Sequence, residues 1–135
     1  MKLNLELIQY INFFEKITKT KVKNCFLYKE RLIFIVGPGQ QRKAVGKGAF
    51  NVKKITKLIN KKIKIVEYND DPVKFINSLA SPIRVESVTF SDNIINLNVK
   101  SAEDRGLLIG RDRRNIENMK KIMSYYYKIK DIKIL

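Results

Sequence analysis

The stretch Ala44-Val45-Gly46-Lys47-Gly48-Ala49-Phe50-Asn51-Val52 returns 64 positions later as Leu108-Ile109-Gly110-Arg111-Asp112-Arg113-Arg114-Asn115-Ile116. Both copies hold a glycine, a basic residue directly after it, and an asparagine further along at the same place. The apolar spacing that follows keeps this offset, and it pairs Val52, Ile55, Leu58 and Ile59 with Ile116, Met119, Ile122 and Met123. The repeat predicts two units of one fold, each with a glycine-basic turn between an apolar run and an amphipathic helix.

Each half of the chain carries the same order of predicted elements: helix, strand, strand, helix, turn, helix, strand. In the first half, the apolar pattern predicts helices near 5–18, 41–45 and 49–60, and strands near 22–28, 32–36 and 63–68. In the second half, it predicts helices near 72–81, 101–109 and 113–126, and strands near 85–90, 94–99 and 129–135. We therefore expect two domains, residues 1–69 and residues 70–135.

Three polar residues mark the expected starts of helices. Asn4 precedes the first amphipathic run and is a plausible N-cap. Asp71 stands directly before Pro72, and proline is favoured at the first helical position. Ser101 is followed three residues later by Asp104, which resembles a capping box.

The net charge of +15 is large for 135 residues and predicts a polyanionic partner. The charge is uneven, since residues 1–69 hold 16 Lys/Arg against 4 Asp/Glu, whereas residues 70–135 hold 12 against 9. Ten basic residues and no acidic residue lie between Arg31 and Val66. The basic region therefore surrounds the first copy of the repeat. The alternative is a solvated cationic surface without a partner.

Several classes of chemistry find no support in the composition. Histidine is absent and Cys25 is the one cysteine, which argues against imidazole catalysis and a zinc site. The adjacent carboxylates Asp70–Asp71 and Glu103–Asp104 are explained by helix starts. A P-loop would need glycine where Gln41 stands and Ser or Thr where Gly48 stands. We therefore expect neither an enzyme nor a bound cofactor or metal.

The cysteine count and the apolar runs bear on location. A single cysteine cannot form a disulfide within the chain, which fits a reducing compartment. The longest clean apolar run, Leu32 to Val36, is too short to span a bilayer, and no secretory signal is visible. We expect a cytoplasmic protein without a membrane partner.

The two turns have the properties needed to hold a phosphate backbone. Glycine tolerates positive φ and removes a side chain that would keep the sugar-phosphate backbone at a distance. The helix after each turn offers free amides and the positive end of its dipole. Lys47 and Arg111 add a mobile charge at the tips. Bases would then lie in an apolar groove beside the turn. The alternative is that both glycine turns merely join helices.

This order of elements resembles the type II KH domain, whose loop between two helices is matched by residues 45–52. Two such units in so short a chain resemble the archaeal form of the transcription factor NusA. Gly37-Pro38-Gly39 before the first loop and residues 104–111 at the second fit that family, and the resemblance covers about 5–135. It implies an α+β fold of two tandem type II KH domains, each a three-stranded mixed sheet with helices packed on one face. It also implies single-stranded RNA binding and a role in transcription termination or antitermination.

The turns and the starts of the helices after them supply the expected RNA-binding residues. In the first unit these are Val45, Gly46, Lys47, Gly48, Ala49, Asn51, Lys53 and Lys54. In the second unit they are Ile109, Gly110, Arg111, Asp112, Arg113, Arg114 and Asn115.

The sequence departs from the KH pattern at the fourth loop position, where glycine is usual. Ala49 stands there in the first unit, and since alanine does not readily adopt positive φ, we expect an altered loop geometry. Arg113 stands there in the second unit, where it could contact phosphate or block its approach. Asp112 adds a negative charge to the second loop, which makes the second unit the weaker candidate for RNA binding.

Other functions are compatible with the same residues. A ribosome- or rRNA-associated factor would clamp single-stranded RNA in the same way. A protein adaptor could use KH-like surfaces to meet RNA polymerase or other factors, and the second unit suits that function best. Tyr125-Tyr126-Tyr127 could stack on bases, although the simpler interpretation is that at least one of them is a core residue and the others partly cover the end of the helix. We expect a monomer whose partners are single-stranded RNA and, beyond it, RNA polymerase or ribosomal components.

Overall fold

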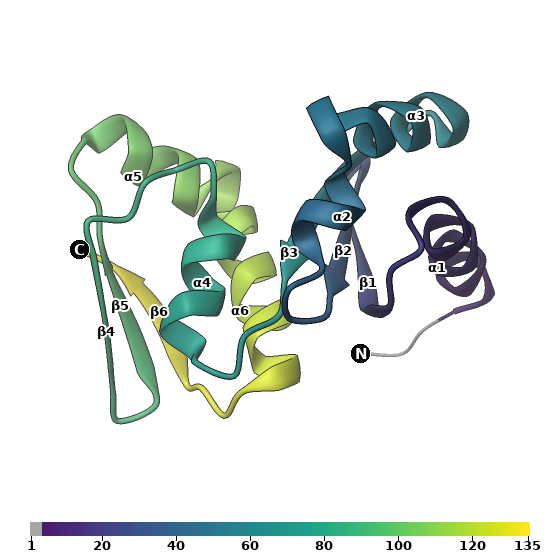
Figure 1. Cartoon of the computed structure of the whole chain (residues 1–135). Helices are drawn as coiled ribbons and strands as arrows, with labels where there is room; N and C mark the ends of the chain where they lie inside the picture. Colours follow the sequence, from purple (N-terminus) through teal and green to yellow (C-terminus); the bar gives the residue numbers. More distant parts are fainter. Residues whose placement is uncertain (1–3) are drawn as a thin grey trace. The chain divides into compact units, whose positions relative to one another are not determined.

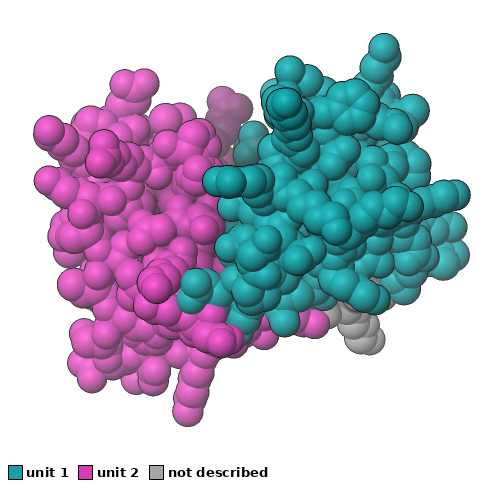
Figure 2. Space-filling model, viewed as in Figure 1, with its two compact units in different colours: residues 1–69 teal, residues 70–135 magenta. Residues whose placement is uncertain are grey.

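The computed structural model describes residues 4–135 and contains two compact units, one ending at Asn69 and one running from Asp70 to Leu135. Figure 1 traces the elements along the chain, and Figure 2 colours the two units separately. Each unit contains a three-stranded sheet and the same order of helices and strands. The predicted α+β class with three-stranded mixed sheets is therefore confirmed.

In the first unit, the middle strand pairs antiparallel with one neighbour and parallel with the other. The sheet order is β1-β2-β3, with β1 and β2 antiparallel and β2 and β3 parallel. A turn of 3₁₀ helix, η1, separates the second and third helices. The elements in chain order are α1 (Leu5–Thr18), β1 (Val22–Tyr28), β2 (Arg31–Val36), α2 (Gln41–Val45), η1 (Lys47–Ala49), α3 (Phe50–Ile59) and β3 (Lys62–Glu67).

The second unit repeats this arrangement with the sheet order β4-β5-β6. All three of its strands are shorter than the apolar pattern predicted, because the strand pairing covers only residues 87–91, 94–98 and 131–134. The elements in chain order are α4 (Pro72–Ala80), β4 (Ser87–Ser91), β5 (Ile94–Asn98), α5 (Ala102–Ile109), η2 (Arg111–Arg113), α6 (Arg114–Tyr126) and β6 (Asp131–Ile134).

The three predicted helix starts are confirmed by side-chain caps. The Oδ1 atom of Asn4 accepts a hydrogen bond from the backbone N of Leu7 at 2.9 Å. Asp71 accepts from the backbone N of Val73 at 2.9 Å. Ser101 Oγ accepts from the backbone N of Asp104 at 3.0 Å. Each cap satisfies an amide that the first helical turn leaves without a partner, which fixes where the helix begins.

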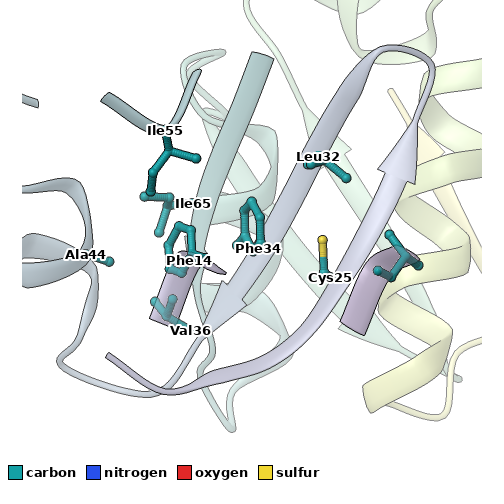
Figure 3. Packing of buried hydrophobic residues seen from close by; sticks show 9 residues of the cluster. Phe14, Cys25, Leu32, Phe34, Val36, Ala44, Ile55 and Ile65 are labelled. Carbon is teal, nitrogen blue, oxygen red and sulfur yellow. The ribbon is translucent and has the colours of Figure 1, made fainter. Parts of the chain in front are cut away.

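The core of the first unit lies between its sheet and its three helices (Figure 3). Cys25, Phe34 and Ile65 are neighbours across the three strands and point to one face of the sheet. The ring of Phe14 from α1 stacks on that of Phe34, with centroids 4.2 Å apart. Burial raises the pKa of the Cys25 thiol to about 12, so this cysteine is a core residue and not a nucleophile. The residues of this buried cluster are Leu7, Phe14, Cys25, Leu32, Phe34, Val36, Ala44, Ile55 and Ile65.

The second unit buries residues from its three helices and from one face of its sheet. Ile95 and Ile132 are paired across β5 and β6, and both are buried. At the end of α6, the rings of Tyr126 and Tyr127 lie 5.6 and 5.7 Å from the ring of Phe75. Two of the three consecutive tyrosines therefore pack against the α4 helix. Both are half-buried, so they cover the end of the helix as predicted, but neither is the fully buried core residue that the sequence led us to expect. The buried helix residues are Phe75, Ile76, Leu79, Ala80, Leu108, Ile116, Met119, Ile122 and Met123.

None of the helices in residues 4–135 combines the length and the apolar character that crossing a membrane requires.

Lys64 gives the first unit a pH-dependent element of stability. It lies in β3 beside Ile33 of β2, on the face of the sheet opposite the buried cluster. Burial, and secondarily the positive charge of Arg31, lowers the pKa of Lys64 from its ordinary 10.5 to about 8. The unfolded chain therefore binds one more proton than the folded chain between these two values. Stability must rise with pH across that window.

Burying the charged form of Lys64 destabilises the folded state at neutral pH. We predict that Lys64→Met removes this cost and raises the free energy of unfolding at neutral pH. The measurement is the midpoint of thermal unfolding of both proteins at pH values from 7 to about 10.5. The difference between variant and wild type should shrink as the pH rises. A difference that stays constant across this range would contradict the assignment to Lys64.

Candidate nucleic-acid interface

The two loops have one backbone conformation. The first glycine has φ +80° in Gly46 and φ +76° in Gly110. At the fourth position, Ala49 has φ +60° and Arg113 has φ +62°, both in the left-handed region. Ala49 and Arg113 therefore adopt the same backbone conformation, although neither is the glycine usual at this position. Holding a residue with a Cβ in this region costs roughly 1 kcal/mol, which each unit tolerates.

The first glycine of each loop lies against the asparagine at the start of the next helix. A Cβ atom on Gly110 would lie 2.7 Å from Cβ of Asn115 and 2.9 Å from its backbone N. A Cβ atom on Gly46 would lie 3.0 Å from Nδ2 of Asn51. A side chain at either position would push the helix start away from the loop. Glycine is therefore required by a close contact as well as by its positive φ.

Both asparagines bond back to the helix before the loop. The Nδ2 atom of Asn115 donates to the carbonyl O of Leu108 at 2.8 Å. The Nδ2 atom of Asn51 donates to the carbonyl O of Lys43 at 3.2 Å. These bonds satisfy carbonyl groups that the end of a helix leaves open. Asn51 and Asn115 were predicted as RNA contacts, and the structure gives them a positioning role within the loop.

The helices after the loops begin without a side-chain cap. Ala49 and Arg113 occupy the N-cap positions of α3 and α6, and neither makes a side-chain cap hydrogen bond. The first-turn amides of these helices differ in this respect from those of α1, α4 and α5, which are capped by Asn4, Asp71 and Ser101. First-turn amides without a side-chain cap can bind an anion, and both of these helix starts lie beside a basic loop tip. The first amide of each helix is already used, since the backbone N of Phe50 donates to the carbonyl O of Lys47 and that of Arg114 to the carbonyl O of Arg111.

The loop tips present their predicted charges to solvent. Lys47 and Gly48 are exposed in the first loop, and a Cβ atom on Gly48 would meet nothing within 4 Å. In the second loop, Arg111, Asp112, Arg113 and Arg114 are all exposed. Arg113 lies 3.9 Å from the carboxylate of Glu117, with both side chains 60% exposed. Because such an exposed pair contributes roughly 0.5 kcal/mol, Arg113 can exchange this partner for a phosphate.

A groove of about 290 Å³ lies beside the second loop. It runs between the start of α6 and the last strand, β6, and Arg113 contributes to its lining. The sequence predicted an apolar groove at this place without naming the strand residues. Alternation of apolar residues in β6 was the available signal, but it could not show which strand faces the loop. The lining residues are Ile109, Arg113, Ile116, Asp131, Ile132, Lys133, Ile134 and Leu135.

The remaining predicted residues lie close to these features. Val45 and Ile109 are half-buried at the ends of α2 and α5, where they anchor the loops. Lys53 and Lys54 are exposed in the first turns of α3. Phe50, at the start of α3, was not among the predicted site residues, and its side chain is 62% exposed. Among residues 4–135, no group of three or more His, Cys, Asp or Glu side chains is placed to hold a metal ion.

We predict that Gly110→Ala destabilises the protein by roughly 1–3 kcal/mol, because of the positive φ and the contact with Asn115. The matched control is Gly106→Ala in the preceding helix, where an added Cβ meets nothing within 4 Å. This control should stabilise the helix by about 0.5–1 kcal/mol. In urea unfolding, the free energy of unfolding should fall for Gly110→Ala and rise for Gly106→Ala. Equal effects would contradict the role assigned to the close contact.

Known proteins share the fold of this chain. The sequence model of the KH domain matches residues 8–103. This match begins in α1 and ends in α5, so it takes in most of the first unit and part of the second. The crystal structure of APE1850 has the same fold, with a TM-score of 0.74 and 27% sequence identity, and the match covers 98% of this chain and 100% of that chain.

Two archaeal proteins are similar over the whole length of the chain. The probable transcription termination protein NusA of Methanocaldococcus jannaschii is 34% identical, and the match covers 100% of this chain and 75% of the relative. The protein of the same name from Methanococcus vannielii is 33% identical, with 100% of this chain and 80% of the relative covered. The chain belongs to the KH domain family and, within it, to the NusA-like proteins of archaea.

Proposed function

We propose that this protein binds single-stranded RNA with two tandem type II KH domains, residues 1–69 and 70–135, and acts in transcription termination or antitermination. The observation that carries the proposal is the pair of matched loops, each with an exposed basic tip and an uncapped helix start. The names of the archaeal relatives support the role in transcription. RNA polymerase is the further partner that this role would require.

Each loop would hold the sugar-phosphate backbone without reading its sequence. In the first unit, a phosphate would lie over the first-turn amides of α3, and Lys47 would neutralise its charge. Gly48 leaves space for the sugar because it has no side chain. In the second unit, Arg111 and Arg113 would neutralise the phosphate, and the negative charge of Asp112 would weaken this attraction.

Bases would lie beside the loop, against apolar side chains. In the groove of the second unit, Ile134 is half-buried and Leu135 is 52% exposed, so both offer accessible apolar surface. Ile116 and Ile132 also line the groove but are buried. Asp131 and Lys133 line the same groove and would supply polar groups for the edges of bases. A KH loop clamps about four nucleotides, so each unit would hold one short segment of RNA.

We predict that Lys47→Asp with Gly48→Asp removes most RNA binding and leaves the fold intact. Asp112 already occupies the position equivalent to Gly48 at φ +54°, which indicates that the loop backbone accepts aspartate there. If about six phosphates are neutralised, log K of the wild type should fall with log salt at a slope of about −4, and the variant should have a shallower slope. Filter binding at several salt concentrations measures both quantities.

The control for this variant makes the same change of net charge elsewhere in the first unit. Lys29→Asp in the β1–β2 turn and Asn12→Asp on α1 replace exposed residues. The control should retain most of the affinity. Equal losses in the two variants would indicate an effect of net charge alone and would contradict clamping by the first loop.

We predict a smaller loss for Arg111→Asp with Arg113→Asp, because Asp112 already weakens the positive potential of the second loop. The expected reduction in affinity is roughly tenfold or more, since each variant position loses a charged contact with phosphate. Unchanged affinity would remove the second loop from the RNA interface. It would leave the second unit as a surface for RNA polymerase or other proteins.

A further inference from the structure

The outer surface of α3 carries exposed residues that neither the fold nor the loop explains. Phe50, Lys53, Lys54, Lys57 and Leu58 are all exposed, and their spacing places them on one side of the helix. We call these five residues the α3 outer face. Its two apolar side chains are 62% exposed at Phe50 and 59% exposed at Leu58. The core of the unit lies on the opposite side of the helix, at Ile55.

All the charged side chains of the α3 outer face are basic. The helix contains no acidic residue, and within residues 4–135 none of its lysines forms an ion pair. By contrast, Lys61, just beyond the helix, lies 3.5 Å from the carboxylate of Glu30. The ammonium group of Lys54 lies 5.9 Å from the centroid of the Phe50 ring. The surface therefore combines available positive charge with an exposed aromatic ring.

The second unit shows that the fold does not require this surface. At the repeat positions of Lys53 and Lys54, α6 has Glu117 and Asn118. The residue equivalent to Leu58 is Ile122, which is fully buried. The same arrangement of helices and strands is therefore built without a continuous basic face and without an exposed apolar residue at this position.

We infer that the α3 outer face extends the RNA interface, with Phe50 stacking on a base and Lys57 neutralising a phosphate. This inference rests on the proposed RNA binding by the first loop. Phe50 follows Ala49 directly, so a strand leaving the loop meets the ring first. The helix, ten residues and about 15 Å long, then presents Lys54, Lys57 and Leu58 along the continuing strand.

Single-stranded RNA is the partner that fits this surface best. Aromatic rings that stack on bases, among cations that follow the backbone, form the usual combination in proteins that bind single strands. An acidic protein segment could also match the lysines. However, the ring lies at the end of the helix that adjoins the proposed phosphate site, which favours continuity with bound RNA.

The test compares labelled RNAs of four and of twelve randomised nucleotides, because four nucleotides fill one loop and its groove. Phe50→Ala should weaken binding of the longer RNA roughly tenfold and leave the shorter RNA unaffected, whereas Phe50→Tyr should retain the affinity. Lys57→Glu should weaken binding of the longer RNA and lower its salt slope by about one. The matched control is Lys121→Glu at the same repeat position on α6, which should have little effect.

The possible results separate this inference from the function on which it rests. Equal losses on both RNAs in Phe50→Ala would mean that the ring acts on the loop, and would overturn the extended interface. Unchanged binding of the longer RNA in Phe50→Ala and Lys57→Glu would also overturn it and would leave the surface to a protein partner. If the wild type binds neither RNA, the proposed function itself fails. Circular dichroism of each variant checks that the fold is retained.

Discussion

The close contact between a glycine and an asparagine is the constraint on which both candidate sites depend. Because Gly110 has no Cβ, the start of α6 can approach the loop closely enough for Asn115 to bond to the carbonyl O of Leu108. In the first unit Gly46 lies against Asn51 in a similar way, and Asn51 bonds to the carbonyl O of Lys43. The contact fixes the first turn of the following helix relative to the loop tip. The amides and the basic side chain proposed to hold a phosphate are thereby brought together.

The two units share this backbone but differ in the side chains that it presents. The first has a small, open tip at Gly48 and a helix without acidic residues behind it. The second places Asp112 at the equivalent position and Glu117 within reach of Arg113. The excess of basic over acidic residues is also concentrated in the first half of the chain. Electrostatic attraction to a polyanion should therefore be stronger in the first unit, although both loops have the same geometry.

The sequence predicted the order of elements well because local signals were strong. The caps Asn4, Asp71 and Ser101 and the single repeat offset located most helices and strands. The lining of the groove was not predictable, because the approach of β6 to the second loop depends on the packing of the sheet. The bonds from the asparagines to the preceding helix were not predictable either, because residue type alone does not reveal which way an amide points, and their contact with RNA stays a prediction.

The fourth loop position shows how the surrounding structure overrides local preference. Glycine would adopt positive φ at this position without strain. In this chain, alanine and arginine adopt positive φ there despite the strain. The residue at the fourth position therefore cannot be what sets the conformation. Gly46 and Gly110, with their asparagine partners, are the features that the two loops have in common. A strain of roughly 1 kcal/mol at Ala49 or Arg113 is small enough for that contact and the packing of the following helix to offset.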